Sequence, residues 1–311
     1  MPAAPALPSD IHVFDRGWLS STNILCLGAQ PAVIDTGHVK HAAQTVTLVR
    51  DVLGDTPLAR IAHTHLHSDH CGGTGALQAA WPQAQTWVPT PSLASVQNWD
   101  QSALTFDETG QRCDPFTAQH ALEPGASVRL GERDWQVHAA LGHDDLAVFL
   151  FNLDDRILIA GDALWEHGVG IIFPQLDGTG GFHLFEQTVD AIEALQPDWL
   201  VPGHGTALAR SDGGIERSLE QARSRVAYYR ERPDQHAMYA AKVMIKYQML
   251  DVEAMTHAAF RAWLDGTELL HELHQTYWAE TSWDEWLQQV LQSLLSKDVL
   301  RQDATHVRDG V

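Results

Sequence analysis

The stretch that decides the fold is residues 61–73, which read IAHTHLHSDHCGG. It follows a strand-like run and precedes a Gly-Gly pair that can start a helix, so we predict a strand-to-helix loop. His65 and His67 are one residue apart, and in extended backbone both rings point the same way. Asp69 and His70 follow at once and must turn in another direction. One short loop could therefore supply ligands to two neighbouring metal ions, and this spacing favours a metal site over core packing.

Strand-like and helix-like stretches alternate on both sides of this loop. Amphipathic helices are predicted over His41–Leu53 and Phe185–Leu195. Short strands are predicted at Ile11–Phe14, Asn23–Leu27, Ala32–Ile34, Ala59–Ala62, Trp135–Ala140, Ala147–Phe151, Arg156–Ala160 and Trp199–Val201. A strand, helix, strand pattern thus occurs twice, around 32–63 and around 156–201. Two such halves would stack their sheets face to face with helices outside, a four-layer αββα sandwich of the α/β class.

The sequence changes character beyond about Ser211. Trp283, Trp286, Leu287 and Val290 recur at helical spacing, which is typical of a helix face packed into a core. We therefore predict a catalytic domain over 1–210 and a mainly helical domain over 211–311, with a short hairpin at 298–307. The polar stretch 105–124 has no clear periodicity, and a loop of that length is usually functional or mobile.

Composition excludes several classes of function. The 311 residues carry 40 Asp and Glu against 20 Lys and Arg, a formal charge of −20, together with 18 His. Phosphate binding relies on Lys and Arg, so this charge argues against nucleic-acid and anionic-membrane partners. The N-terminus resembles no signal peptide, and three widely spaced cysteines form no disulfide framework. We expect a cytoplasmic protein with a small-molecule substrate and leave open whether it is a homodimer.

Five motifs carry a resemblance to a known family. The HTHLHSDH run at 63–70 resembles the HxHxDH signature of the metallo-β-lactamase-fold hydrolases. The other motifs of that family follow the same order in this chain: Asp35 in VIDTG, His143 in LGHDDLAVFLF, Asp162 in IAGDALW and His204 in VPGHG. The resemblance covers roughly residues 11–206 and implies the αββα fold.

The resemblance also implies a ligand set. One zinc ion would be held by His65, His67 and His143. A second would be held by Asp69, His70 and His204, with Asp162 bridging both ions. Such a pair of ions, with iron or manganese as alternatives to zinc, would hydrolyse an ester, thioester or lactone through a metal-bridging hydroxide. Asp69 would also have a catalytic role in orienting that nucleophile.

Several residues near the predicted ligands have either a supporting role in the site or an ordinary structural role. Asp35 is either an outer acceptor that fixes a ligand imidazole or an ordinary turn residue. Trp165, His167 and Phe173, just after Asp162, either line a substrate pocket or pack ordinarily. Cys71 is expected to be a small buried residue, and His63 is expected to be structural.

The same motifs are compatible with other functions. Within the family the chain resembles the glyoxalase II-like branch, because its predicted C-terminal helices are placed like the substrate-covering region of that type. Many thioesterases of this type carry a His-Thr-x-Gly-His-Thr run at the third ligand, whereas this chain has HAALGHDDL at 138–146. The resemblance therefore does not carry glutathione-thioester specificity over. An iron-dependent redox member of the fold could use a subset of the same ligands. A metal-binding signalling protein with little turnover would keep all of them.

Overall fold

The computed structural model describes residues 7–310, which form two compact units. The first unit contains residues 7–104 and 112–227, and the second contains 105–111 and 228–310. No helix in the described part of the chain is both long and apolar enough to cross a membrane.

The first sheet of the first unit has six strands in the order β1-β2-β3-β4-β5-β6. Strands β1 to β3 pair antiparallel, and β3 to β6 pair parallel. Helices α1 (Ala42–Leu53) and α3 (Thr74–Ala80) pack against this sheet, and side chains of the helices and strands together form an apolar cluster. The strands are β1 (Ile11–Phe14), β2 (Asn23–Cys26), β3 (Ala32–Ile34), β4 (Arg60–Ala62), β5 (Gln85–Pro89) and β6 (His120–Leu122).

The second sheet has the order β12-β11-β10-β9-β8-β7. Its parallel pair, β10 and β11, is joined through α7 (Gly181–Leu195), just as β3 and β4 are joined through α1. Both crossovers are β-α-β units, the pattern expected from the sequence. The strands are β7 (Ser127–Leu130), β8 (Arg133–Ala139), β9 (Val148–Asn152), β10 (Ile157–Gly161), β11 (Trp199–Pro202) and β12 (Leu208–Ala209).

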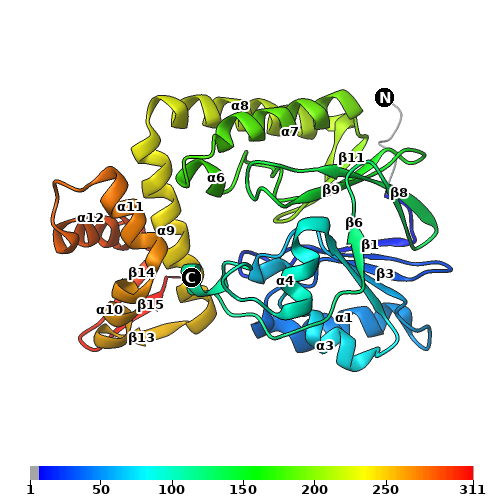
Figure 1. Cartoon of the computed structure of the whole chain (residues 1–311), viewed down its shortest axis with the longest axis horizontal. Helices are drawn as coiled ribbons and strands as arrows, with labels where there is room; N and C mark the ends of the chain where they lie inside the picture. The colour runs from blue at the N-terminus through cyan, green and yellow to red at the C-terminus, as the bar shows by residue number, and fades with distance from the viewer. Residues whose placement is uncertain (1–6, 311) are drawn as a thin grey trace. The chain divides into compact units, whose positions relative to one another are not determined.

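The main core lies between the two sheets. Side chains from both sheets meet there, among them Ile24, Ile34, Trp135, Leu150 and Val201. Figure 1 shows α1 and α3 outside the first sheet, and α7 outside the second. Because each sheet has a cover on both faces, central strands such as β9 and β10 are buried along their whole length. This arrangement confirms the predicted αββα sandwich.

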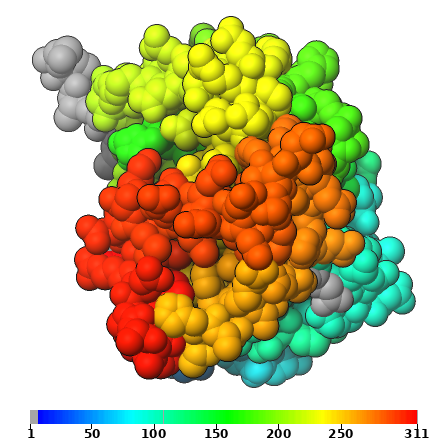
Figure 2. Space-filling view, turned by 90° about the vertical axis from the view of Figure 1, so that its left-hand side faces the viewer, coloured from blue at the N-terminus to red at the C-terminus, as the bar shows by residue number. Residues whose placement is uncertain are grey.

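The second unit is mainly helical. Its small sheet has the order β13-β15-β14, so the predicted hairpin is present and gains a third strand that the sequence did not indicate. The surface of this unit is seen in orange and red in Figure 2. Its elements are α5 (Phe106–Thr109), α9 (Pro233–Val252), β13 (Ala254–Thr256), α10 (His257–Gly266), α11 (Glu268–Tyr277), α12 (Trp283–Leu295), β14 (Leu300–Gln302) and β15 (His306–Asp309).

The division into units differs from the predicted boundary at 210/211. Helix α8 (Gly214–Glu231) begins in the first unit, where Ser218 Oγ donates a hydrogen bond to the carbonyl of Trp165 and Arg223 pairs with Asp190 and Glu193 of α7. These contacts hold the start of the helix, so the division comes only after residue 227. The predicted loop 105–124 also contains the short helix α5 and the strand β6.

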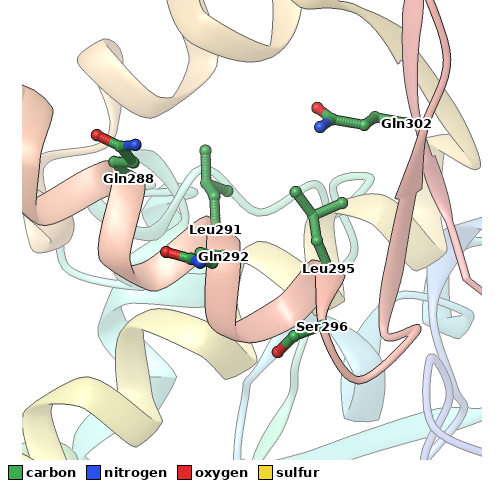
Figure 3. A pocket seen from close by; sticks show the side chains of 6 residues that line it. All are labelled: Gln288, Leu291, Gln292, Leu295, Ser296 and Gln302. Carbon is green, nitrogen blue, oxygen red and sulfur yellow. The ribbon is translucent and has the colours of Figure 1, made fainter.

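An open pocket of about 650 Å³ lies in the second unit. Figure 3 shows Leu291 and Leu295 of α12 beside the amide of Gln302 of β14. Its lining is completed by Gln288, Gln292 and Ser296. None of these six side chains ionises near neutral pH or is a usual metal ligand, so the lining indicates neither an acid–base group nor a metal site.

Candidate metal centre

The predicted ligands all follow strands that end at the same edge of the two sheets. Strand β4 leads to His65 through His70, β8 to His143, β10 to Asp162 and β11 to His204. Parallel pairing of β3 with β4 and of β10 with β11 puts the carboxyl ends of these strands together. Strand β8 is antiparallel to β9, which is antiparallel to β10, so β8 ends at that edge as well. Ligands of α/β sheets commonly bind at such an edge.

The loop after β4 is shaped by the Gly-Gly pair that closes the HTHLHSDHCGG run. His67 is extended, with φ −61° and ψ 148°, and it begins the one-turn helix α2 (Ser68–Cys71) that carries Asp69 and His70. A Cβ on Gly72 would lie 2.4 Å from the Val39 nitrogen, and one on Gly73 would lie 2.4 Å from the Thr36 carbonyl oxygen. Two glycines are therefore needed here for close backbone approach.

His65, His67 and His143 form the first ligand group. His67 Nδ1 lies 3.0 Å from His65 Nε2 and 2.9 Å from His143 Nε2. Three imidazole nitrogens thus converge on one point. The predicted trio is brought together by the structure.

Asp69, His70, Asp162 and His204 form the second ligand group. Asp69 Oδ2 lies 3.0 Å from His204 Nε2 and 3.7 Å from His70 Nε2. All four side chains are buried. This group is the second predicted set with Asp162 added.

Asp162 faces both groups. Its Oδ1 lies 3.3 Å from His70 Nε2, and its Oδ2 lies 3.4 Å from His143 Nε2 and 3.9 Å from His204 Nε2. One carboxylate therefore has neighbours in the first group and in the second. This is the position that a bridging ligand would need.

Most of the ligand imidazoles are fixed by a hydrogen bond from the ring nitrogen that points away from the group. His143 Nδ1 donates to the Ile171 carbonyl at 2.6 Å, and His204 Nδ1 donates to the Gly17 carbonyl at 3.3 Å. His70 Nδ1 donates to Asp35 Oδ2 at 2.7 Å. Such bonds set the tautomer and leave Nε2 available as a ligand. Asp35 is thus placed as an outer acceptor, at a backbone φ of 52° that aspartate tolerates better than most residues.

The electrostatics of the first group favour neutral rings. Burial lowers the pKa of His65 well below its ordinary value, and neighbouring His70 and His67 lower it further. Burial also lowers the pKa of His143 to about 4. Neutral imidazoles are the form that binds metals.

In the second group, two carboxylates lie close to histidine rings, and this lowers the pKa values of the carboxylates. Burial would raise the pKa of Asp69, but the nearby His70 and His204 lower it to about 2. Burial likewise opposes the ionisation of Asp162, yet His70 and His204 hold its pKa well below the ordinary value. Both carboxylates are therefore ionised at neutral pH.

The donor set fits a pair of divalent metal ions. His70 Nε2 is buried and makes no well-aligned hydrogen bond, although Asp162 Oδ1 lies only 3.3 Å away. In each group the ligand atoms lie within 4.8 Å of one another. Imidazole nitrogens and carboxylate oxygens that converge in this way suit zinc and the other first-row divalent metals.

The three predicted pocket residues have different positions. Trp165 Nε1 donates to Asp162 Oδ1 at 3.1 Å, and its ring lies edge-on to His204 with centroids 5.2 Å apart. Phe173 lies edge-on to His67 and His143, at 5.1 and 5.6 Å. His167 is exposed in the tight turn that joins Trp165 to Gly168, and none of the ring contacts among the described residues involves it.

Trp18 is a neighbour of the centre that the sequence did not indicate. Its ring stacks on His204 with centroids 5.7 Å apart and an interplanar angle of 17°. The residue lies between β1 and β2, far from the histidine motifs along the chain. Neither periodicity nor ligand spacing marks it, so only the fold reveals its place.

Two residues beside the histidine motif have supporting positions. His63 Nε2 is 2.9 Å from Thr74 Oγ1 and its ring is fully buried, which agrees with the structural role expected for it. Cys71 is fully buried, as expected, and burial raises the pKa of its thiol well above the ordinary value. Its Sγ lies 3.7 Å from Cys113 Sγ and not among the ligand atoms.

Comparison with known proteins identifies the family. The family model of the metallo-beta-lactamase superfamily matches residues 16–204, which is more than half of the chain. The protein therefore belongs to the metallo-beta-lactamase superfamily.

Curated relatives that match include hydroxyacylglutathione hydrolases. The chain is 29% identical over 144 residues to the enzyme of Bdellovibrio bacteriovorus, which is 46% of this chain and 47% of that one. It is 26% identical over 142 residues to the enzyme of Prochlorococcus marinus, 45% of this chain and 48% of that one. The chain thus spans about half the length of the curated relatives it matches.

Solved structures share the fold at low identity. A metallo-beta-lactamase family protein from Thermus thermophilus aligns with a TM-score of 0.57 and 16% identity, over 98% of this chain and 100% of that one. A beta-lactamase domain protein from Burkholderia ambifaria aligns with a TM-score of 0.57 and 18% identity, over 89% and 90%. These likenesses support the fold alone.

Proposed function

We propose that the protein is a dinuclear zinc hydrolase that cleaves a small ester, thioester or lactone. The observation that carries this proposal is the position of Asp162, whose two oxygens face ligands of both groups. A carboxylate in this position can bridge a metal pair, because each of its two oxygens can bind one ion. The hydroxyacylglutathione hydrolases among the relatives support thioester or ester cleavage as the reaction class.

The proposal assigns each ligand a place. His65, His67 and His143 would hold one zinc ion, and Asp69, His70 and His204 would hold the other, with Asp162 shared. When bound, the metal pair supplies activated water at neutral pH and an electrophile for the scissile carbonyl.

The side chains around the ligand groups fix the positions of the reacting water and of the ligands. Asp69 is held by His204 at 3.0 Å, so its carboxylate has a fixed direction from which it can orient the attacking water. Trp165 donates to Asp162 Oδ1 and so keeps that carboxylate in place. Phe173 packs edge-on against His67 and His143 and so limits the directions that these two rings can take.

Glutathione is a weaker choice of substrate than a less charged compound. The chain lacks the His-Thr-x-Gly-His-Thr run, its charge is −20, and the glutathione-specific relatives are matched over only about half their length. The proposal therefore extends to esters and lactones as well as thioesters. The protein as proposed acts on a small molecule in the cytoplasm.

Metal analysis and a substrate screen test the proposal. The full chain, purified without added metal, is expected to contain zinc and to hydrolyse at least one of a set of thioesters, lactones and aryl esters. His67→Ala and Asp162→Asn are expected to lower kcat/KM by at least about a hundredfold because each removes a ligand. His183→Ala and Asp154→Asn, at exposed positions, serve as matched controls and are expected to retain activity.

Two results would contradict the proposal. Full activity in folded His67→Ala and Asp162→Asn proteins would rule out a reaction that depends on the metal pair. Two equivalents of iron with no hydrolysis of any test compound would favour the redox alternative instead.

A further inference from the structure

Among the described residues, Trp18 is the most exposed large apolar side chain, at 64%. Single exposed apolar residues are common on protein surfaces and usually carry no meaning. This one differs in its neighbours, since its ring stacks on the candidate ligand His204. A large exposed indole beside a metal centre is therefore available to whatever approaches the metals.

The backbone on both sides of Trp18 is fastened to the ligand loops. The Gly17 carbonyl accepts the hydrogen bond from His204 Nδ1. Further along, the Ser21 amide donates to the Asp69 carbonyl at 2.9 Å, and the Thr22 amide donates to the Gly203 carbonyl at 2.6 Å. Exposure of the indole is thus combined with a fixed backbone, as a preformed binding surface requires.

A second indole completes a corner. The rings of Trp18 and Trp165 have centroids 5.6 Å apart and an interplanar angle of 76°. Trp165 is held by its bond to Asp162 and, through its carbonyl, by Ser218. The two rings flank His204, one stacked on it and the other edge-on to it. We call Trp18 and Trp165 the indole corner.

We propose that the indole corner binds an apolar group of the substrate, an aryl ring or an acyl chain, next to the second ligand group. The proposal rests on the proposed hydrolase function and adds the chemical class of the substrate. Indole faces offer a large contact area and no charge that would pair with a carboxylate. Trp18 is accordingly a specificity-determining residue, and the preferred substrates are esters, thioesters or lactones with an apolar substituent.

Binding of hydroxamates to the zinc-loaded full chain tests the indole corner without any turnover. Benzohydroxamate and acetohydroxamate share a metal-binding head and differ in their apolar group. Isothermal calorimetry is expected to show tighter binding of benzohydroxamate to the wild type. Trp18→Ala is expected to weaken the binding of benzohydroxamate about tenfold, because a ring buries a large apolar area. The binding of acetohydroxamate is expected to weaken less than about twofold.

Two variants and one analysis control the measurement. Trp18→Phe keeps an aromatic face and is expected to retain most of the preference. Leu153→Ala removes another exposed apolar side chain, 58% exposed, from the turn between β9 and β10 and is expected to leave both affinities unchanged. Because Trp18 touches His204, the zinc content of every variant is measured before titration.

The outcomes separate this inference from the proposed function. An equal loss for both hydroxamates, no loss for either, or no preference in the wild type would overturn the indole corner. A preference that depends on Trp18 in a protein that cleaves no ester, thioester or lactone would support the indole corner and contradict the hydrolase. The opposite result is also informative: kcat/KM is measured for the ethyl thioesters of acetic and hexanoic acid in the wild type and in Trp18→Ala. Hydrolysis of both compounds with no dependence on Trp18 would support the hydrolase and contradict the indole corner.

Discussion

Asp35 shows how much of the centre depends on a residue outside both ligand groups. Three donors converge on its two oxygens: His70 Nδ1, the Thr64 amide and the Thr64 hydroxyl. Burial would raise the pKa of this carboxyl, yet His70 and His63 hold it below the ordinary value. Asp35 is therefore an ionised acceptor that orients the ring of His70.

Replacing Asp35 by asparagine is expected to weaken zinc binding by about 10- to 100-fold. An amide has one acceptor oxygen, so at least one of the three donors would face an NH₂ group. Competition with a chromophoric chelator measures the change in affinity. Asp55→Asn, an equal change of charge at an exposed turn, is the matched control. An unchanged zinc affinity in Asp35→Asn would show that His70 does not need this acceptor.

At the scale of secondary-structure elements, the ends of the strands position the ligands, and Gly203 shows how closely they pack. A Cβ at this position, just after β11, would lie 2.1 Å from Asp162 Oδ1 and 2.9 Å from His70 Cε1. The end of β11 can therefore approach the end of β10 only with glycine there. The position of Asp162 between the two ligand groups depends on that approach.

Gly203→Ala is expected to push Asp162 away and to reduce zinc affinity by about tenfold or more. Zinc titration of the folded variant measures this. Gly266→Ala, where an added Cβ would meet nothing within 4 Å, is expected to leave zinc binding unchanged. If Gly203→Ala bound both zinc ions with wild-type affinity, Asp162 would have room to move without any loss of zinc binding.

The sequence predicted the β-α-β units well because their helices and strands have clear periodicity and punctuation. It also grouped the ligands as the structure places them, since His65, His67, Asp69 and His70 lie in one motif and the later motifs match a family pattern. The sequence did not predict the place of Trp18 beside the ligands, the strand β13 or the residue at which the first unit ends. Their positions depend on contacts between segments far apart in the chain, such as Trp18 with His204 and α8 with α7.

At the scale of the whole molecule, the stability of the protein is expected to depend on a histidine outside the metal centre. His236 of α9 is buried against Tyr229, with ring centroids 5.0 Å apart. Burial lowers the pKa of His236 to about 4, from an ordinary 6.5. Between these two pH values the unfolded chain binds a proton at this position and the folded chain does not.

The free energy of unfolding is therefore expected to fall as the pH drops from 7 to 5, by on the order of 2 kcal/mol from this residue. Urea titrations at both pH values measure it. His236→Gln removes the titrating group, so the variant should lose less stability on acidification than the wild type. An equal loss in both proteins would show that His236 titrates normally in the folded state.

The two ligand groups also bear on how the chain folds. Each group takes ligands from both halves of the first unit: His65 and His67 with His143 in one, Asp69 and His70 with Asp162 and His204 in the other. An ion bound in either group would tie chain segments more than 70 residues apart, as a covalent cross-link does, and would favour the assembled state over an open chain. The facing sheets would then be fastened at one edge by metal coordination, in addition to the apolar core between them.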